Sequence, residues 1–277
     1  MSRLLHMLKS KKFWTRFISG VILVAVALFV VNKGGFVLFC TTLAISLIGL
    51  FELYRVLKME WEPIGWVGYI ASIVYYVLMW KGISRFDMVV FIGALMMLMT
   101  IFVFTFPRYK TEQISVGFFG IFYVVVMLSF LYRLRSVSDG RLLVWLIFIS
   151  SWGSDTFAYV VGMLVGKHHI TPVLSPKKTW EGCIGGVIGA GLLGYIYGSF
   201  AGSYMHAVEN PQVSCALACA FSGIISQIGD FAASAIKRDH GIKDYGDLIP
   251  GHGGILDRFD SMLFTAPAIY FAIYFLR

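Results

Sequence analysis

The chain is a succession of apolar stretches, each close to the length of a membrane-spanning helix. A span needs about 20 predominantly apolar residues, and the stretches that approach this length number about nine: residues 17–32, 34–54, 64–80, 87–106, 114–132, 142–164, 183–203, 213–235 and 261–276. Only 14% of the residues are charged, whereas about 25% are charged in an average soluble domain. Because helices satisfy their backbone hydrogen bonds internally in lipid, the sequence predicts an all-α, polytopic helical membrane protein.

The connections between these stretches are short, and the sequence contains no internal repeat and no extramembrane domain. We therefore expect one integral membrane domain over residues 1–277. Residues 1–140 would supply N-terminal spans, and residues 141–277 would supply the spans and loops that carry the chemistry. The lack of targeting or soluble extensions fits a bacterial inner membrane.

The basic residues predict the orientation. With a cytoplasmic N-terminus, 16 of the 23 Lys and Arg residues fall on the inner side, as the positive-inside rule requires. The outer connection "YRLRSVSDGR" departs from this trend through Arg133, Arg135 and Arg141. It either dips inward to meet an anionic group, or the count of spans fails there. In this layout the two long polar segments, residues 166–182 and 236–260, both face the cytoplasm.

The second polar segment mixes both signs of charge. Its cations are Lys237, Arg238, Lys243 and Arg258, and the acids among and beside them are Asp239, Asp244, Asp247, Asp257 and Asp260. Cations at the inner membrane face often serve only topology or lipid attraction. A topology signal does not need the acids, whereas a site that joins a metal to a polyphosphate needs both signs. The segment therefore favours a cytoplasmic phosphate site.

Three aspartates are candidate metal ligands. Asp230 lies inside an apolar span, where carboxylates are costly and usually functional. Alternatively, it belongs to a polar seam between helices, with Ser226, Ser234 and Lys237 on the same face. Asp257 and Asp260 stand at i and i+3 where the last span begins, and helix capping is an alternative for one of them. Such hard oxygen ligands suit Mg²⁺.

The glycine-rich stretch at 250–254 predicts a turn with unusual backbone angles. Gly253 and Gly254 would let a phosphate approach backbone N–H groups closely, although a plain interhelical loop is the alternative. His252 either donates to a phosphate or only shapes the turn.

The first polar segment contains "SPKKTWEG". Ser175, Lys177, Lys178 and Thr179 offer hydroxyl and ammonium donors to a phosphate, and a basic topogenic loop is the alternative. Upstream, Asp155 is a second acid within an apolar run, and such an acid is functional by default. Glu52, near the inner end of an N-terminal span, is expected to pair with Arg55 at i+3.

The run "SAIKRDHGIKDYGDLIPGHGGILDRFD" from Ser234 to Asp260 resembles the signature of the phosphatidate cytidylyltransferase family, also called CDP-diacylglycerol synthases. The blocks "SDTFAYVVG" around Asp155 and "SPKKTWEG" around Lys177 and Lys178 resemble the same family. The likeness extends over roughly residues 150–261. The N-terminal half resembles the family only in being hydrophobic and multispanning.

This resemblance implies transfer of CMP from CTP to phosphatidate, giving CDP-diacylglycerol and pyrophosphate in phospholipid synthesis. It also implies an all-helical membrane enzyme that forms a homodimer, with Mg²⁺ on Asp230 and Asp257 and a monovalent cation such as K⁺ beside it. We expect Lys177, Lys178, Lys237, Arg238 and Lys243 to neutralise the triphosphate. Asp244 and Asp260 would orient these cations or hold metal-bound water.

Other classes of protein compete with this prediction. A CTP-dependent lipid kinase or a headgroup transferase would use the same metal chemistry. A secondary transporter would carry buried acids, but transporters usually contain inverted repeats, and the sequence shows none. A structural membrane scaffold would need no buried acids. Nucleic acid is not an expected partner, because no basic stripe is interleaved with aromatic residues on a soluble face.

Overall fold

A computed structural model of the protein describes residues 11–171, 174–251 and 253–276. The chain divides into two compact units. Unit 1 comprises Met1–Ile121 and Lys243–Arg258, and unit 2 comprises Phe122–Ile242 and Phe259–Arg277. The loop before the last helix therefore groups with the N-terminal helices. The expected single domain, with its catalytic part starting at residue 141, stays a prediction.

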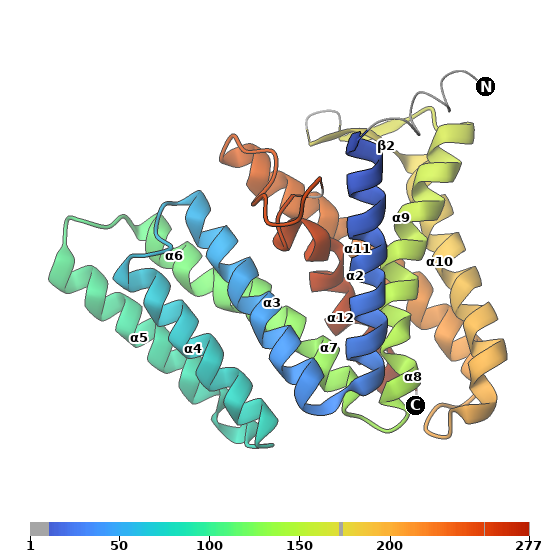
Figure 1. The fold of residues 1–277 in the computed structure, drawn as a ribbon, viewed down its shortest axis with the longest axis horizontal. Coiled ribbons are helices and arrows are strands. Elements are labelled where there is room, and N and C mark those ends of the chain that lie inside the picture. Colours follow the sequence, from blue (N-terminus) through green and yellow to red (C-terminus); the bar gives the residue numbers. More distant parts are fainter. Residues whose placement is uncertain (1–10, 172–173, 252, 277) are drawn as a thin grey trace. The chain divides into compact units, whose positions relative to one another are not determined.

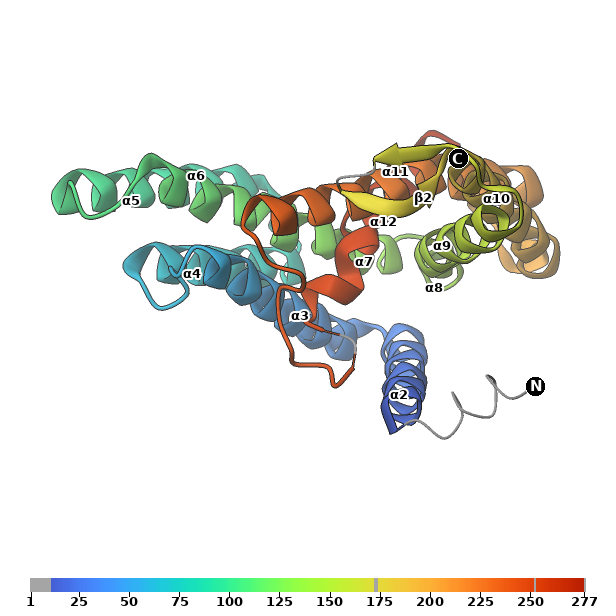
Figure 2. The ribbon, with the colours of Figure 1, turned by 90° about the horizontal axis from the view of Figure 1, so that it is seen from above.

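Unit 1 is helical. Its elements are α2 (Lys11–Lys33), α3 (Gly35–Val56), α4 (Pro63–Trp80), η1 (Ser84–Phe86), α5 (Asp87–Thr105) and α6 (Thr111–Gly120). Gly34 has a φ of 63°, a left-handed conformation that interrupts the helical path between α2 and α3. Pro63 begins α4, where its missing N–H costs no hydrogen bond. Helices α4, α5 and α6 pack side by side, as Figures 1 and 2 show.

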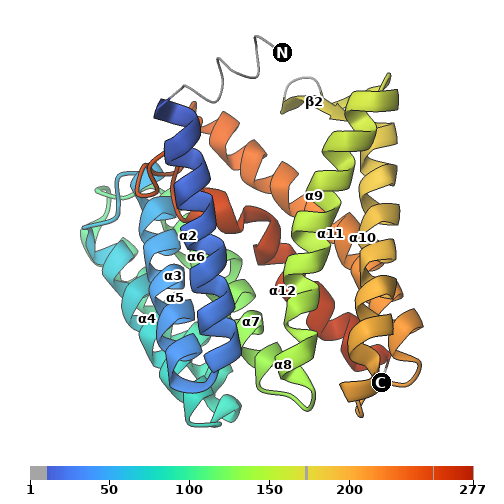
Figure 3. The ribbon, with the colours of Figure 1, turned by 45° about the vertical axis from the view of Figure 1, so that its right-hand side comes forward.

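In its described residues, unit 2 contains a short π-helix, six α-helical segments, a 3-10 turn and one hairpin. Its elements are η2 (Ile121–Val126), α7 (Met127–Arg135), α8 (Gly140–Leu143), α9 (Trp145–Val165), β1 (His169–Thr171), β2 (Ser175–Thr179), α10 (Trp180–Ala201), η3 (Gly202–Tyr204), α11 (Pro211–Asp239) and α12 (Leu256–Phe275). The first residue of η2 and the first three of α12 belong to unit 1. The antiparallel strands β1 and β2 form a hairpin, and Figure 3 shows β2 where α9 ends and α10 begins.

Glycines along α10 allow its backbone to approach α9 and α11 closely. A Cβ atom at Gly186 would lie 2.8 Å from the carbonyl oxygen of Ser154 on α9. A Cβ atom at Gly198 would lie 2.6 Å from the carbonyl oxygen of Pro211 on α11. Small residues at helix contacts are typical of membrane bundles, because association there depends on close packing. These glycines therefore hold α10 close to α9, which carries Asp155, and to α11, which carries Asp230.

Seven helices in the described part of the chain are long and apolar enough to cross a membrane. They cover Gly35–Val56, Pro63–Trp80, Ser84–Thr105, Thr111–Arg135, Gly140–Val165, Trp180–Tyr204 and Pro211–Asp239. The first predicted span corresponds to a shorter apolar helix, Ile18–Lys33, and the last falls on α12, whose first turns carry three charged residues. Large apolar side chains such as Phe104 (84% exposed) and Phe200 (79% exposed) face outward, as in a chain surrounded by lipid. The fold class, an all-α integral membrane protein, agrees with the prediction. The count of nine spans and the cytoplasmic N-terminus stay predictions.

Candidate active site

The loop Lys243–Arg258 of unit 1 folds around the carboxylate of Asp257. This side chain is buried, with 4% exposed. Its Oδ2 atom accepts hydrogen bonds from the backbone N–H groups of Tyr245 (2.8 Å) and Gly254 (3.0 Å). Asp257 thus ties the start of the loop to its end. Both N–H groups precede α12, so the capping alternative for this residue stays a prediction.

The expected pairing of Glu52 with Arg55 is wrong. In the described residues, Glu52 Oε1 accepts from the backbone N–H of Ile255 (3.0 Å), and Oε2 accepts from that of Leu256 (2.8 Å). Arg55 Nη2 donates instead to the carbonyl oxygen of Tyr245 (2.8 Å). The i+3 spacing permitted the pair, but both side chains reach the backbone of the distant loop, where the first N–H groups of α12 lack helical partners.

The predicted glycine turn is confirmed at two positions. Gly251 has a φ of 78° and Gly253 a φ of 86°, a backbone region that favours glycine. The N–H of Ile249 donates to the carbonyl oxygen of Gly253 (2.9 Å), which closes the turn. Gly254 lies against the carboxylate of Glu52. His252 lies outside the described residues.

Residues of the loop line an open polar cavity of about 590 Å³ in unit 1. Two predicted cations, Lys243 and Arg258, line it together with Asp244 and Asp247. Gly246, Ile249, Gly251 and Gly253 complete the wall. The cavity therefore combines positive charge for an anion with acids that can orient the cations, as a phosphate site requires.

The first polar segment forms the hairpin and the start of α10 in unit 2. Ser175 begins β2 and pairs in register with Thr171. Thr179 is buried, with 5% exposed, and its Oγ1 accepts from the N–H of Gly182 (3.2 Å), so it caps α10. A substrate contact by Thr179 stays a prediction beside this structural role.

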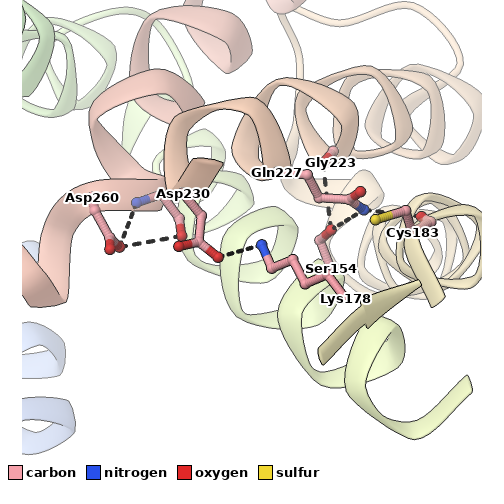
Figure 4. A network of polar contacts seen from close by, with 8 residues as sticks. Ser154, Lys178, Cys183, Gly223, Gln227, Asp230 and Asp260 are labelled. Carbon is pink, nitrogen blue, oxygen red and sulfur yellow. Dashed lines mark hydrogen bonds and ion pairs between the residues drawn. The ribbon is translucent and has the colours of Figure 1, made fainter. Parts of the chain in front are cut away.

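An ion pair joins two candidate site residues that lie in different parts of the sequence. Lys178 Nζ on β2 donates to Asp230 Oδ2 on α11, as Figure 4 shows. The ammonium also lies 4.4 Å from the centroid of the Phe231 ring, close enough for a cation–π contact. Neither side chain is deeply buried, since 24% of Lys178 and 27% of Asp230 are exposed. The intramembrane acid therefore has a cation as its partner, as such acids usually do.

Both residues of this ion pair line a second cavity of about 320 Å³. It brings together the predicted residues Asp155, Lys177, Lys178, Thr179 and Asp230. Small residues of α9 and α10, namely Ala158, Gly162 and Gly182, supply part of its wall. The three helices and the hairpin of unit 2 thus converge on one recess, whose largely apolar wall carries these charged side chains.

Gln227 is a residue of this cavity that the sequence reasoning missed. It is 7% exposed. Its Nε2 donates to Ser154 Oγ (3.1 Å) and to the carbonyl oxygen of Cys183 (2.9 Å), as Figure 4 shows. A carbonyl only accepts, so the amide nitrogen must face Cys183. A carboxamide in an apolar span was the available signal, because buried polar groups need partners.

The remaining predicted residues lie on α11 and α12. Lys237 and Arg238 occupy the last turn of α11, where cations favour the helix dipole, and Arg238 Nη1 donates to the carbonyl oxygen of Ile242 (3.2 Å). Ser234 lies on the same helix, one turn after Asp230. Asp260 Oδ1 on α12 accepts from the N–H of Ser261 (2.8 Å). Asp257 belongs to unit 1 and Asp230 to unit 2, so their sharing of one metal ion stays a prediction.

Comparison with known proteins gives consistent matches along the chain. Residues 14–276 match the model of the cytidylyltransferase family. A phosphatidate cytidylyltransferase of Bacillus subtilis (strain 168) is 32% identical over 266 residues, which cover 93% of this chain and 96% of that protein. Proteins of the same name from Staphylococcus epidermidis (strain RP62A) and Staphylococcus aureus (strain COL) are each 30% identical, covering 92% of this chain and 96% of their own length.

Proposed function

The chain belongs to the cytidylyltransferase family, and we propose that it transfers CMP from CTP to phosphatidate, giving CDP-diacylglycerol and pyrophosphate. The observation that carries this proposal is the grouping of the motif residues. Cations and carboxylates from separate motifs line two cavities within an integral membrane protein. The relatives named phosphatidate cytidylyltransferase, which align over nearly the whole chain, support the same substrates.

The reaction needs charge neutralisation more than it needs a base. A phosphate oxygen of phosphatidate attacks the α-phosphorus of CTP, and the bond from that phosphorus to the bridging oxygen of the β-phosphate breaks. The phosphate monoester is already largely dianionic at neutral pH, since its second pKa is about 6. The obstacle is the repulsion between two anionic substrates, which grows as the dielectric constant falls. Positioning and electrostatic stabilisation therefore dominate, as in other phosphoryl transfers.

The residues of each unit have roles consistent with this chemistry. In unit 1, Lys243 and Arg258 face the cavity of the loop and neutralise phosphate oxygens, while Asp244 orients them. In unit 2, Lys177 and Lys178 line the second cavity and supply further positive charge. Lys237 and Arg238, at the end of α11, add to the same neutralisation.

We propose Mg²⁺ as the cofactor, with the carboxylates of Asp230 and Asp257 as its protein ligands. The donor chemistry fits, because Mg²⁺ is commonly held by one or two carboxylates, water and substrate phosphates. Consistently, no group of three or more His, Cys, Asp and Glu side chains within the described ranges can hold a metal by itself. When bound, Mg²⁺ would neutralise charge on the phosphates. A K⁺ ion beside it remains an expectation from the resemblance.

The membrane setting follows from the substrates. Phosphatidate keeps its acyl chains in lipid, whereas CTP and pyrophosphate are soluble in water, so the reaction belongs at the membrane boundary. We propose that this boundary is the cytoplasmic face of a bacterial inner membrane, that nine spans anchor the enzyme, and that it acts as a homodimer. The excess of basic residues in the predicted inner segments supports the orientation.

Purified protein in detergent–phosphatidate micelles tests the reaction. CTP labelled in the cytidine and Mg²⁺ are added, and label in lipid is measured together with released pyrophosphate. We expect equal amounts of both, and loss of both with a chelator or with Asp257→Asn. Wild-type protein that transfers no label would refute the proposed function. Transfer that survives in a folded Asp257→Asn protein would refute the proposed role of this carboxylate.

A further inference from the structure

Helix α3 places a carboxylate and a guanidinium against the loop Lys243–Arg258. Glu52 binds the N–H groups of Ile255 and Leu256, and Arg55 binds the carbonyl oxygen of Tyr245. All five residues belong to unit 1. The two side chains therefore connect an N-terminal helix, far away in the sequence, to both ends of the loop that carries Lys243 and Arg258.

The environment of Glu52 indicates a built contact. The residue is 3% exposed, and a buried carboxylate is very costly without partners. Each of its two oxygens accepts one N–H at the beginning of α12. These N–H groups lack acceptors within the helix, and negative charge is favourable at that end of the helix dipole. Burial, hydrogen bonding and the dipole thus fix the same arrangement.

Two glycines of the loop make room for this carboxylate. A Cβ atom at Gly254 would lie 2.5 Å from Glu52 Oε2, and one at Gly246 would meet Oε1. Real Cβ atoms essentially never approach a heavy atom so closely, so neither position accepts a larger residue without movement. Gly246 also lines the 590 Å³ cavity. The carboxylate of Glu52 therefore lies directly behind the cavity wall.

We propose that Glu52 is a positioning residue for the loop Lys243–Arg258, together with Arg55, which holds the start of the same loop. By fixing the backbone of Ile255 and Leu256, it holds Arg258 and the cavity wall ready for the phosphate oxygens of a substrate. A preorganised loop does not have to become ordered when the phosphate binds. The kinetic consequences of this inference rest on the proposed function, whereas the claim that Glu52 fixes the backbone of Ile255 and Leu256 does not depend on activity.

Glu52→Gln is the sharpest test, because it keeps size and shape while replacing one acceptor oxygen with an NH₂ group. That NH₂ group would face a backbone N–H, so one hydrogen bond becomes a clash of donors. Glu62→Gln is the matched control: Glu62 lies in the same unit and binds Arg108 (2.6 Å) and Tyr109 (2.7 Å), neither of which belongs to the loop. Both proteins are compared with wild type for folding, steady-state kinetics and hydrogen exchange.

We expect faster amide exchange at Ile255 and Leu256 in Glu52→Gln only. We also expect kcat/KM to fall about 10- to 100-fold, the size expected for loss of a hydrogen bond to a charged group. The fall should appear as a raised KM for the substrate whose phosphates enter the loop. Measuring KM for CTP and for phosphatidate separately identifies that substrate. Glu62→Gln should resemble wild type in every measurement.

Two results would overturn the inference. One is a Glu52→Gln protein with wild-type kinetics, whatever its exchange rates. The other is a fall in kcat matched by a fall in the folded fraction, with both KM values unchanged, because a merely structural residue would behave so. Wild-type protein without label transfer would instead refute the proposed function. In that case amide exchange still tests whether Glu52 holds the backbone of Ile255 and Leu256, and unaltered exchange in Glu52→Gln would refute it.

Arg55→Ala provides the test if Glu52→Gln does not fold. Arg55 is exposed, so its truncation is far less disruptive than a change at the buried Glu52. It removes the single bond to the carbonyl oxygen of Tyr245. The inference predicts a rise in the same KM, smaller than that for Glu52→Gln, and wild-type values of both KM would contradict it.

Discussion

Carboxylates occur both at the loop of unit 1 and in the cavity of unit 2, but their partners differ. At the loop, the carboxylates of Asp257 and of Glu52, which reaches it from α3, accept backbone N–H groups and are almost fully buried. In unit 2, the carboxylate of Asp230 is partly exposed and pairs with the ammonium of Lys178. Glu52 and Asp257 thus hold the backbone of the loop in place, whereas Asp230 holds a side-chain cation. Equivalent substitutions in the two regions should therefore have different consequences.

Asp257→Asn should have the largest combined effect. The side chain is 4% exposed and its Oδ2 accepts two backbone N–H groups, so loss of its charge weakens the loop as well as the proposed metal site. We expect transfer to be abolished and the free energy of unfolding to fall by about 1.5–3 kcal/mol, as for hydrogen bonds to charged groups. Label transfer and thermal unfolding in detergent measure the two effects. Wild-type stability would show that Asp257 does not hold the loop.

Asp230→Asn should separate activity from stability. We expect transfer to fall about 100-fold or more, because a bound metal ion contributes several kcal/mol to catalysis. The stability should change less than in Asp257→Asn, since Asp230 is 27% exposed and asparagine still accepts from Lys178. The same two assays apply. Equal losses of stability in both variants would refute the contrast drawn between the two regions.

Gly246→Ala tests whether the wall of the loop cavity needs the space beside Glu52. The added methyl group would meet Glu52 Oε1 and lie 3.0 Å from the Cα atom of Gly254. We expect kcat/KM to fall about tenfold, in line with the 1–3 kcal/mol cost of overpacking. Gly93→Ala on α5 is the control, because nothing lies within 4 Å of its added methyl group. Equal activity of the two variants would contradict the close packing of the loop.

Gln227→Leu should affect stability more than catalysis. It removes the donor to Ser154 Oγ and to the carbonyl oxygen of Cys183. We expect the free energy of unfolding to fall by about 1–3 kcal/mol, because buried acceptors lose a partner, and both KM values to change less than the KM that is raised in Glu52→Gln. Thermal unfolding and steady-state kinetics measure both. An unchanged unfolding temperature would show that this network does not stabilise unit 2.

Glu62→Gln should have the smallest effect of the series. It breaks the ion pair with Arg108, whose side chain is 59% exposed, and such pairs contribute about 0–1 kcal/mol. We expect unchanged transfer and an unfolding temperature close to that of wild type. A loss of activity like that of Glu52→Gln would show that any acid of unit 1 matters, and would remove the specific role assigned to Glu52.

The sequence predicted the features that depend on neighbouring residues. Apolar length predicted helices, and the glycine pattern predicted the left-handed angles of Gly251 and Gly253. It did not predict partners that are distant along the chain. Glu52 and Ile255 are 203 residues apart, and the local spacing favoured Arg55 instead. A hydroxyl beside two lysines predicted that Thr179 contacts phosphate, but the sequence did not predict that Thr179 also caps α10. Gln227 has no charge, so the charged residues of the apolar spans gave no indication of it.

The position of the label in CTP tests the central claim most directly. Wild-type protein is given phosphatidate and Mg²⁺ with CTP labelled either at the α-phosphate or at the γ-phosphate. Cytidylyl transfer predicts that the α-label enters lipid and that the γ-label leaves as pyrophosphate in equal amount. Entry of the γ-label into lipid, with CDP as the released product, would contradict the account and identify a lipid kinase.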